Sequence, residues 1–101
     1  MLKLVELTPS YGQASYGHKA IVHFNDDGTK ALYSYETKVC YGSADGFKGY
    51  RLTRAIYDPE KGKLRKTTMR HIADFLYQMG VYGEVPTSKQ ILKDFTEAID
   101  N

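Results

Sequence analysis

The chain has 101 residues, of which 42 % are hydrophobic and 26 % are charged, the balance of one ordinary soluble globular domain covering residues 1–101. No apolar run approaches the roughly 20 residues that cross a bilayer. The first ten residues are too short and too charged to be a secretory signal. A single cysteine, Cys40, excludes an internal disulfide framework, so we expect a cytoplasmic protein.

The net charge of +2 is unevenly distributed along the chain. Residues 48–71 contain eight Lys and Arg against two acidic residues, a net charge of +6. Residues 1–47 carry a net charge of −1 and residues 72–101 a net charge of −3. This pattern predicts a bipolar molecule with one basic segment in the middle of the chain.

The first part of the chain predicts β-strands, because β-branched and aromatic residues alternate there with turn residues. Asp27-Gly28 is a strong hairpin signal, since glycine adopts a positive φ without steric cost. The segment 31–41 alternates with period two and places Tyr33, Tyr35 and Tyr41 on one face. The predicted strands are 2–7, 19–25, 31–41 and 47–57.

The last third of the chain changes to the period of an α-helix. We expect Thr67 or Thr68 to cap a helix near 68–79, which Gly80 ends in the left-handed conformation. A second amphipathic helix is expected near 88–99. The order of elements predicts an α+β fold, an antiparallel four-stranded meander followed by two C-terminal helices packed on one face.

Signatures of enzymes and metal sites are nearly absent. The sequence contains no P-loop, nucleophile elbow, HExxH motif or dinucleotide-binding glycine pattern. Cys40 and His23 could pair across neighbouring strands as a thiol and its base, but no third residue is evident to orient the histidine. Cys40 is more simply a small buried hydrophobic residue. His18 and His23 would point to opposite faces of a strand, so we expect no metal and no cofactor.

The basic segment contains the best candidate binding site. A helix start offers unpaired N–H groups and partial positive charge, which favour an anion. We expect Arg70 and His71 in the first turn, where they work against the helix unless an anionic group compensates. Alternatively these side chains are solvated, with Arg70 paired to Asp74. The candidate binding residues are Tyr50, Arg51, Arg54, Lys61, Lys63, Arg65, Lys66, Arg70 and His71.

Nine tyrosines without a tryptophan are an unusual count. If helices cover the face of Tyr33, Tyr35 and Tyr41, these are core residues whose hydroxyl groups reach the rim, and this is the simpler expectation. If that face is open, tyrosines beside Arg51 and Arg54 form a stacking platform for single-stranded nucleic acid or a surface for a protein partner.

Two motifs resemble a family of small uncharacterised proteins of phages and other mobile elements. The first is a Tyr-x-Thr-x-Val strand and the second a Thr-Thr-x-Arg-His-Ile-x-x-Phe-Leu helix. The corresponding residues are Tyr35, Thr37, Val39, Thr67, Thr68, Arg70, His71, Ile72, Phe75 and Leu76. The resemblance implies an accessory protein inside a host cell and carries no activity or catalytic residue.

The helix motif has a second interpretation. The paired threonines with Arg70 and His71 are then a lock between the helix and the meander, hydrogen-bonded to strand carbonyls or to a hydroxyl group such as that of Tyr35. The sequence leaves the lock and the ligand site both open.

We therefore expect a non-enzymatic accessory protein, in the cytoplasm of a host cell, that binds and modulates a host or phage protein such as a defence factor. The alternative is a nucleic-acid-binding accessory protein that uses residues 48–71. A protein partner is favoured because the sequence pI is about 8.6, below the value of roughly 9 that marks many nucleic-acid-binding domains. Tyrosine and arginine together are also enriched at protein interfaces.

Overall fold

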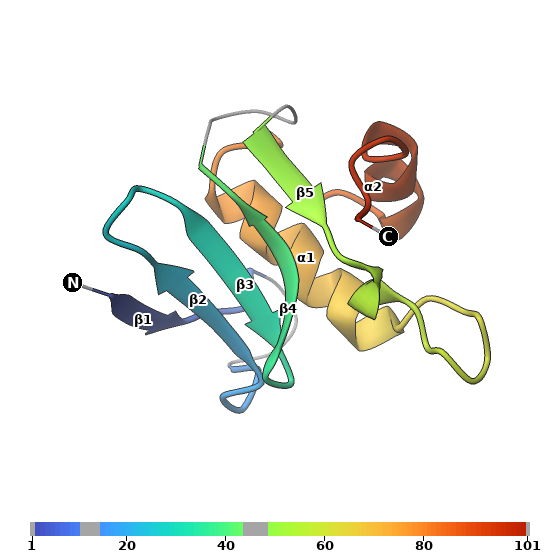
Figure 1. The fold of residues 1–101 in the computed structure, drawn as a ribbon, viewed down its shortest axis with the longest axis horizontal. Coiled ribbons are helices and arrows are strands. Elements are labelled where there is room, and N and C mark those ends of the chain that lie inside the picture. Colours follow the sequence, from blue (N-terminus) through green and yellow to red (C-terminus); the bar gives the residue numbers. More distant parts are fainter. Residues whose placement is uncertain (1, 11–14, 44–48, 101) are drawn as a thin grey trace.

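The computed structural model describes residues 2–10, 15–43 and 49–100. Five strands form one antiparallel sheet in chain order: β1 (Lys3–Glu6), β2 (Ala20–Phe24), β3 (Lys30–Ser34), β4 (Thr37–Gly42) and β5 (Tyr50–Leu52). The 3-10 helix η2 (Arg54–Ile56) then leads to α1 (Lys66–Gln78) and α2 (Ser88–Asp94). The predicted α+β meander with two C-terminal helices is confirmed, with one strand more than expected (Figure 1).

The additional strand arises within the segment 31–41, which alternation predicted as one strand. Tyr35 and Glu36 have φ angles of 51° and 69°, so the chain reverses there and β3 pairs with β4. Two-residue hairpin turns require positive φ, and their usual sequence signal is Asn-Gly or Asp-Gly. This turn is built from neither dipeptide, and the prediction of a single strand was therefore wrong.

Helix α1 covers one face of the sheet, the face that carries Leu32 and Ser34 (Figure 1). The pairing of β3 with β4 shifts register between Leu32 and Tyr33, so that alternation along β4 is broken. Tyr33 and Tyr41 lie on the opposite face, which no described helix covers and which we call the uncovered face, and they are only half-buried. The expectation that helices cover these tyrosines was wrong.

The last predicted strand, 47–57, is shorter than expected. Its described part forms β5 and then η2, where the Thr53 hydroxyl accepts a hydrogen bond from the Ala55 N–H at 3.3 Å. The predicted start at residues 47 and 48 lies outside the described residues. On its outer side, Leu52 donates its N–H to the Ala98 carbonyl and accepts from the Asp100 N–H, both at 2.8 Å. The C-terminal segment thus covers this edge of the sheet.

Both helices start or end away from their expected positions. α1 begins at Lys66, and its N-cap is Arg65 rather than a threonine. Gly80 follows the helix with a φ of 85°, the left-handed conformation that was predicted. α2 is only seven residues long, and after it the Thr96 hydroxyl donates to the Leu92 carbonyl at 2.8 Å. Among the described residues, neither helix is long and apolar enough to cross a membrane.

The core lies between the sheet and the helices. Tyr50 from β5 is 1 % exposed and packs edge-on against Phe75 of α1, with ring centroids 5.9 Å apart. Cys40 is completely buried, as expected for a small hydrophobic residue of the sheet. Other fully buried residues are Leu32, Leu52, Ile56, Met69, Ile72, Leu76, Ile91 and Phe95.

Candidate binding surface at the start of helix α1

Within the basic segment, residues 57–64 form a loop that projects from the molecule between η2 and α1 (Figure 1). Tyr57 and Leu64 close the loop as an antiparallel bridge, and the Asp58 N–H donates to the Lys63 carbonyl at 2.7 Å. The Lys61 and Lys63 side chains are exposed on this loop. The local turn therefore presents cations to solvent beside the start of the helix.

The first turn of α1 has no acceptor side chain to cap it. Its N-cap, Arg65, makes no side-chain capping hydrogen bond, and no acidic residue lies in the first turn. The Arg65 backbone N–H donates to the Ile56 carbonyl at 2.8 Å, and its Nε donates to the Tyr57 carbonyl at 3.3 Å. Positive charge from the helix dipole and from Lys66 thus adds up at one exposed place.

Two adjoining hollows, of about 280 and 340 Å³, flank this helix start. Both are lined by Tyr35, Arg65 and Thr68, and the Tyr35 side chain is 50 % exposed. The remaining lining residues are Ser34, Thr37, Val39, Ala55, Lys66 and Thr67. The hollows combine hydroxyl groups, an aromatic ring and two cations, a composition that suits an acidic and partly apolar ligand surface. We call the projecting loop, the helix start and these hollows the basic surface.

The threonine and histidine of the helix motif lie beneath the hollows and connect α1 to the sheet. His71 Nδ1 lies 2.8 Å from Ser34 Oγ, and Thr68 Oγ1 lies 3.3 Å from the same oxygen. All three residues are buried. The lock between helix and meander exists, but its partner in the sheet is the Ser34 hydroxyl rather than a strand carbonyl or the Tyr35 hydroxyl. His71 is 1 % exposed and is not part of the surface.

A second buried contact joins α1 to the segment between β1 and β2. Tyr16 donates its hydroxyl hydrogen to Asp74, which also accepts from the Ser10 N–H at 3.4 Å. Burial and the hydrogen bond to Asp74 raise the pKa of Tyr16 to about 12, an effect that the exposed Arg70 partly offsets. Asp74 is 4 % exposed, so it is a buried acceptor and not a solvated surface carboxylate.

The remaining predicted binding residues are divided between surface and core. Arg51 points to the uncovered face of the sheet, where its Nε lies 2.6 Å from Asp100, a carboxylate that also accepts from the Tyr41 hydroxyl. Arg54 is exposed, with its guanidinium 5.6 Å from the Tyr57 ring centroid. Tyr50 is a core residue and takes no part in any surface. The structure thus brings Arg54, Lys61, Lys63, Arg65 and Lys66 to the exterior of one region.

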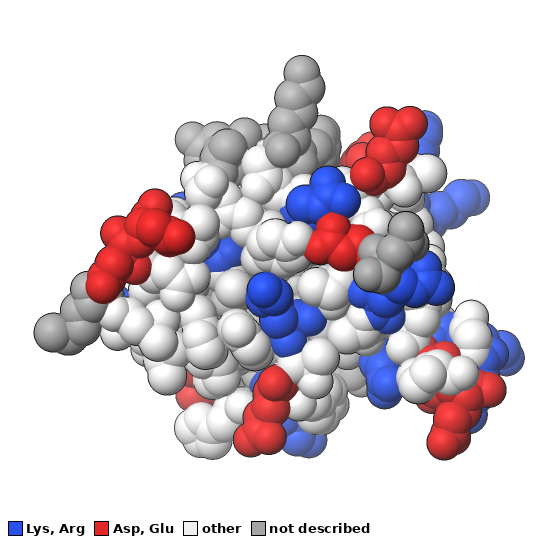
Figure 2. Space-filling model, viewed as in Figure 1, with Lys and Arg blue, Asp and Glu red and all other residues white. Residues whose placement is uncertain are grey.

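Figure 2 shows the charges on the side of the molecule that faces away from α1. Lys and Arg side chains lie over β4, β5 and the loop beyond them, while Asp and Glu side chains lie at the end that carries the β2–β3 turn and also among these cations, including on the loop. Cations and acidic side chains are therefore interspersed on this side, and the basic surface is defined by the exposed residues named above rather than by one half of the molecule.

The thiol and histidine considered for catalysis lie on opposite faces of the sheet. Leu32 pairs with both Val22 and Cys40, whereas His23 pairs with Ala31 and is stacked on Tyr33 at 4.0 Å. Burial raises the pKa of the Cys40 thiol. Within the described residues, no three His, Cys, Asp or Glu side chains are grouped so that they could hold a metal ion.

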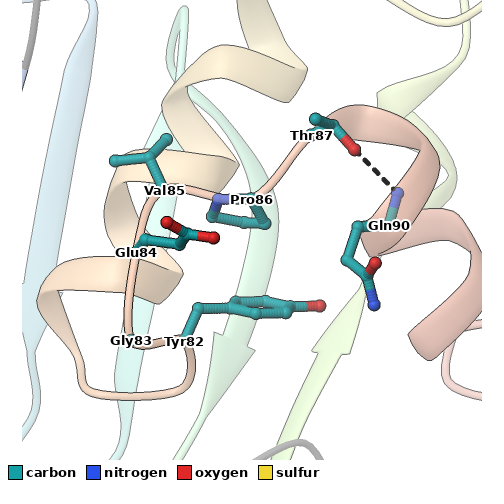
Figure 3. Close-up of a pocket in the computed structure, with 7 residues that line it drawn as sticks. All are labelled: Tyr82, Gly83, Glu84, Val85, Pro86, Thr87 and Gln90. Carbon is teal, nitrogen blue, oxygen red and sulfur yellow. Dashed lines mark hydrogen bonds between the residues drawn. The ribbon is translucent and has the colours of Figure 1, made fainter.

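The sequence predicted only a connection over residues 81–86, yet a hollow of about 510 Å³ lies there (Figure 3). Three of its lining residues, Tyr82, Thr87 and Gln90, form internal hydrogen bonds. The Tyr82 hydroxyl and the Gln90 amide both donate to Asp94 at 2.8 Å, and the Thr87 hydroxyl accepts from the Gln90 N–H at 3.1 Å. Since these bonds tie the connection to α2, the hollow carries no evident chemistry.

A family model described as a family of unknown function, DUF8033, matches residues 2–94. The chain belongs to this family. Comparisons with curated proteins and with solved structures found no match. The matched residues include all five strands, both helices and the whole basic surface, so the DUF8033 match covers the candidate site together with the fold that positions it.

Proposed function

We propose that the chain is a non-enzymatic binding domain whose basic surface docks on an acidic surface of a protein partner. The observation that carries this proposal is the group of exposed cations around an uncapped helix start. Lys61, Lys63 and Lys66 form no ion pair with any other described residue, so their charge is available to a partner. Exposed Tyr35 and the adjoining hollows add apolar area in the same place.

A protein surface suits this arrangement better than a duplex does. Desolvated contacts of tyrosine and arginine contribute most at protein interfaces, and they need few charges. Opposite charges at the rim raise the association rate and are screened by salt. The motif resemblance supports an accessory role in a phage or other mobile element, which would place the chain in the cytoplasm of a host cell, with a host or phage protein such as a defence factor as its partner.

The test is affinity capture from a host lysate, with and without nuclease, by the wild type and by a variant carrying Lys63→Glu, Arg65→Glu and Lys66→Glu. We expect the wild type to capture a protein both with and without nuclease treatment. The captured amount should be at least tenfold lower with the variant. The matched control is Lys30→Glu with Lys89→Glu and Lys93→Glu, which changes the net charge equally at other places and should retain the protein. Equal capture by both triple variants would contradict the proposal.

Nucleic acid is the second candidate, and one observation favours it. Tyr33 and Tyr41 lie on the uncovered sheet face, and the Lys38 ammonium group lies 4.7 Å from the Tyr41 ring centroid. Aromatic rings beside cations stack single-stranded bases. It ranks second because Asp100 already engages both Tyr41 and Arg51. Tight, sequence-selective retention of DNA or RNA in a mobility-shift assay at about 150 mM salt would reverse this order.

A further inference from the structure

The two edges of the sheet differ in how they are covered. The outer side of β5 pairs with the C-terminal segment through Leu52, as described above. β1 is the other edge strand, and no other described strand pairs with its outer side. An uncovered edge presents backbone N–H and C=O groups that can pair with another chain.

The pairing of β1 with β2 shows which residues of β1 direct their backbone N–H and C=O groups outward. Leu7 lies opposite Ala20 in this register and donates its N–H to the Ala20 carbonyl at 2.8 Å. Hydrogen-bonded and non-hydrogen-bonded pairs alternate along an antiparallel ladder, so Val5 bonds to β2 while Leu4 and Glu6 direct their N–H and C=O groups outward.

The side chains of this edge are unusually apolar for an exposed strand. Leu2, Leu4 and Val5 are 52 %, 58 % and 37 % exposed, and together with Tyr35 they are the exposed large hydrophobic residues of the described chain. Leu4 also borders a hollow of about 330 Å³ on the uncovered face, which Ile21 and Tyr33 line. Natural edge strands usually avoid such exposure because it promotes pairing.

We propose that β1 binds an extended segment of a protein partner, which adds to the sheet as an antiparallel strand. The outward groups of Leu4 and Glu6 form the new ladder, and apolar residues of the segment pack opposite Leu4 and Val5. Lys3 is exposed and selects an acidic residue opposite it. Glu6 already accepts from the His18 N–H at 3.3 Å and lies 2.9 Å from His18 Nδ1, and a basic residue of the segment would add to this contact. Read from its N-terminus, the bound segment is basic, apolar, apolar, acidic.

Charge and symmetry favour a foreign segment over a second copy of this chain. Two copies related by a two-fold axis would pair their outward residues, so Leu4 would lie opposite Leu4 or Glu6 of the other copy. Lys3 would then lie opposite Val5 or Leu7, and Glu6 opposite Leu2 or Leu4. Neither register brings a lysine to a glutamate. A second copy therefore places no opposite charge across the new ladder from Lys3 or Glu6, whereas the segment described above does so for both.

This proposal concerns the edge opposite β5 and does not rest on the basic surface. Its probe is a synthetic peptide of sequence Thr-Arg-Val-Ile-Glu-Thr, compared with the charge-exchanged peptide Thr-Glu-Val-Ile-Arg-Thr. Binding is followed by fluorescence anisotropy and by amide hydrogen exchange of the full chain. We expect the first peptide to bind at least tenfold more tightly and to slow exchange of the Leu4 and Glu6 amides at least tenfold.

A third peptide, Thr-Arg-Val-Ile-Lys-Thr, differs from the first only at the acidic position. The wild type should prefer the first peptide, the variant Lys3→Glu should prefer the third, and Lys89→Glu on α2 should keep the wild-type preference. Both lysines are exposed, and circular dichroism establishes that the variants are folded. Binding without protection of Leu4 and Glu6, or no binding of either peptide at millimolar concentration, would overturn the proposal. So would protection of these two amides that rises with protein concentration alone, because it would identify a second copy as the occupant.

Discussion

Ser34 and His71 lie 37 residues apart in the chain, yet their side chains meet in the core, with Oγ 2.8 Å from Nδ1. Ser34 ends β3 and His71 lies in α1, so this contact joins the sheet to the helix that covers it. The Tyr16 ring packs edge-on against the imidazole at 4.4 Å. His71 therefore contacts the sheet and the segment before β2 from one buried position.

The first prediction concerns pH. Burial lowers the pKa of His71 from its ordinary value of 6.5, an effect that Arg70 and Lys19 increase and Asp74 opposes. The unfolded chain then binds a proton more readily than the folded chain, so stability is retained above about pH 6.5 and lost as pH falls below it. We expect the free energy of unfolding to decrease between pH 7 and 5, by at most about 1.4 kcal/mol per pH unit from this group.

Urea denaturation at several pH values measures this slope. His71→Asn retains an amide near Ser34 but does not titrate, so it should flatten the dependence. His18→Asn is the control, since His18 is exposed and its φ of 64° suits asparagine. An unchanged slope in His71→Asn would rule out His71 as the group responsible.

The second prediction compares two adjacent threonines. Thr68→Val removes a buried hydroxyl 3.3 Å from Ser34 Oγ, and we expect a loss of about 1–2 kcal/mol in the free energy of unfolding. Thr67 is exposed, so Thr67→Val should change stability by less than about 0.5 kcal/mol. Thermal and chemical denaturation of both variants give the comparison. Equal effects would show that the hydroxyl of Thr68 contributes nothing specific.

The third prediction concerns Cys40, which is completely buried with a thiol pKa raised by burial. A thiol reagent should label the folded protein only as fast as the protein unfolds, because the thiolate does not form in the core. Cys40→Ala should cost about 1 kcal/mol of packing and leave partner capture intact. Rapid labelling under native conditions, or a folded variant that no longer captures the partner, would contradict this prediction and revive a role for the thiol.

The fourth prediction concerns Gly42 in β4. A Cβ atom at this position would lie 2.0 Å from the Gly49 carbonyl oxygen and 2.7 Å from the Tyr50 ring, so the backbone would have to move. We expect Gly42→Ala to destabilise the fold by about 1–3 kcal/mol. Gly83 has open space around it, and Gly83→Ala should remain within about 0.5 kcal/mol of the wild type in the same denaturation experiment.

Features that depend on near neighbours in the chain could be predicted from the amino-acid sequence. Apolar spacing predicted both helices, and Asp27-Gly28 predicted the β2–β3 turn, where Gly28 has a φ of 89°. The hydrophobic character of Cys40 predicted its burial. The exposure of the lysines in the basic segment was predictable because the free-energy cost of burying an unpaired charge is too high for a cluster of lysines to lie in a core. These are local or one-residue properties, and they needed no knowledge of distant partners.

Which face of the sheet is covered, and what the motif residues contact, depends on how α1 packs on the sheet and could not be predicted from the sequence. Alternation with period two is symmetrical between faces, so the pattern alone could not show that α1 covers the face of Leu32 rather than the face of Tyr33. The turn at Tyr35 and Glu36 exists because pairing of β3 with β4 stabilises a backbone conformation that these residues seldom adopt alone. Ser34 and Asp100 entered no sequence argument, because their partners, His71 and Arg51, are distant in the chain and meet them only when the sheet and helices pack together.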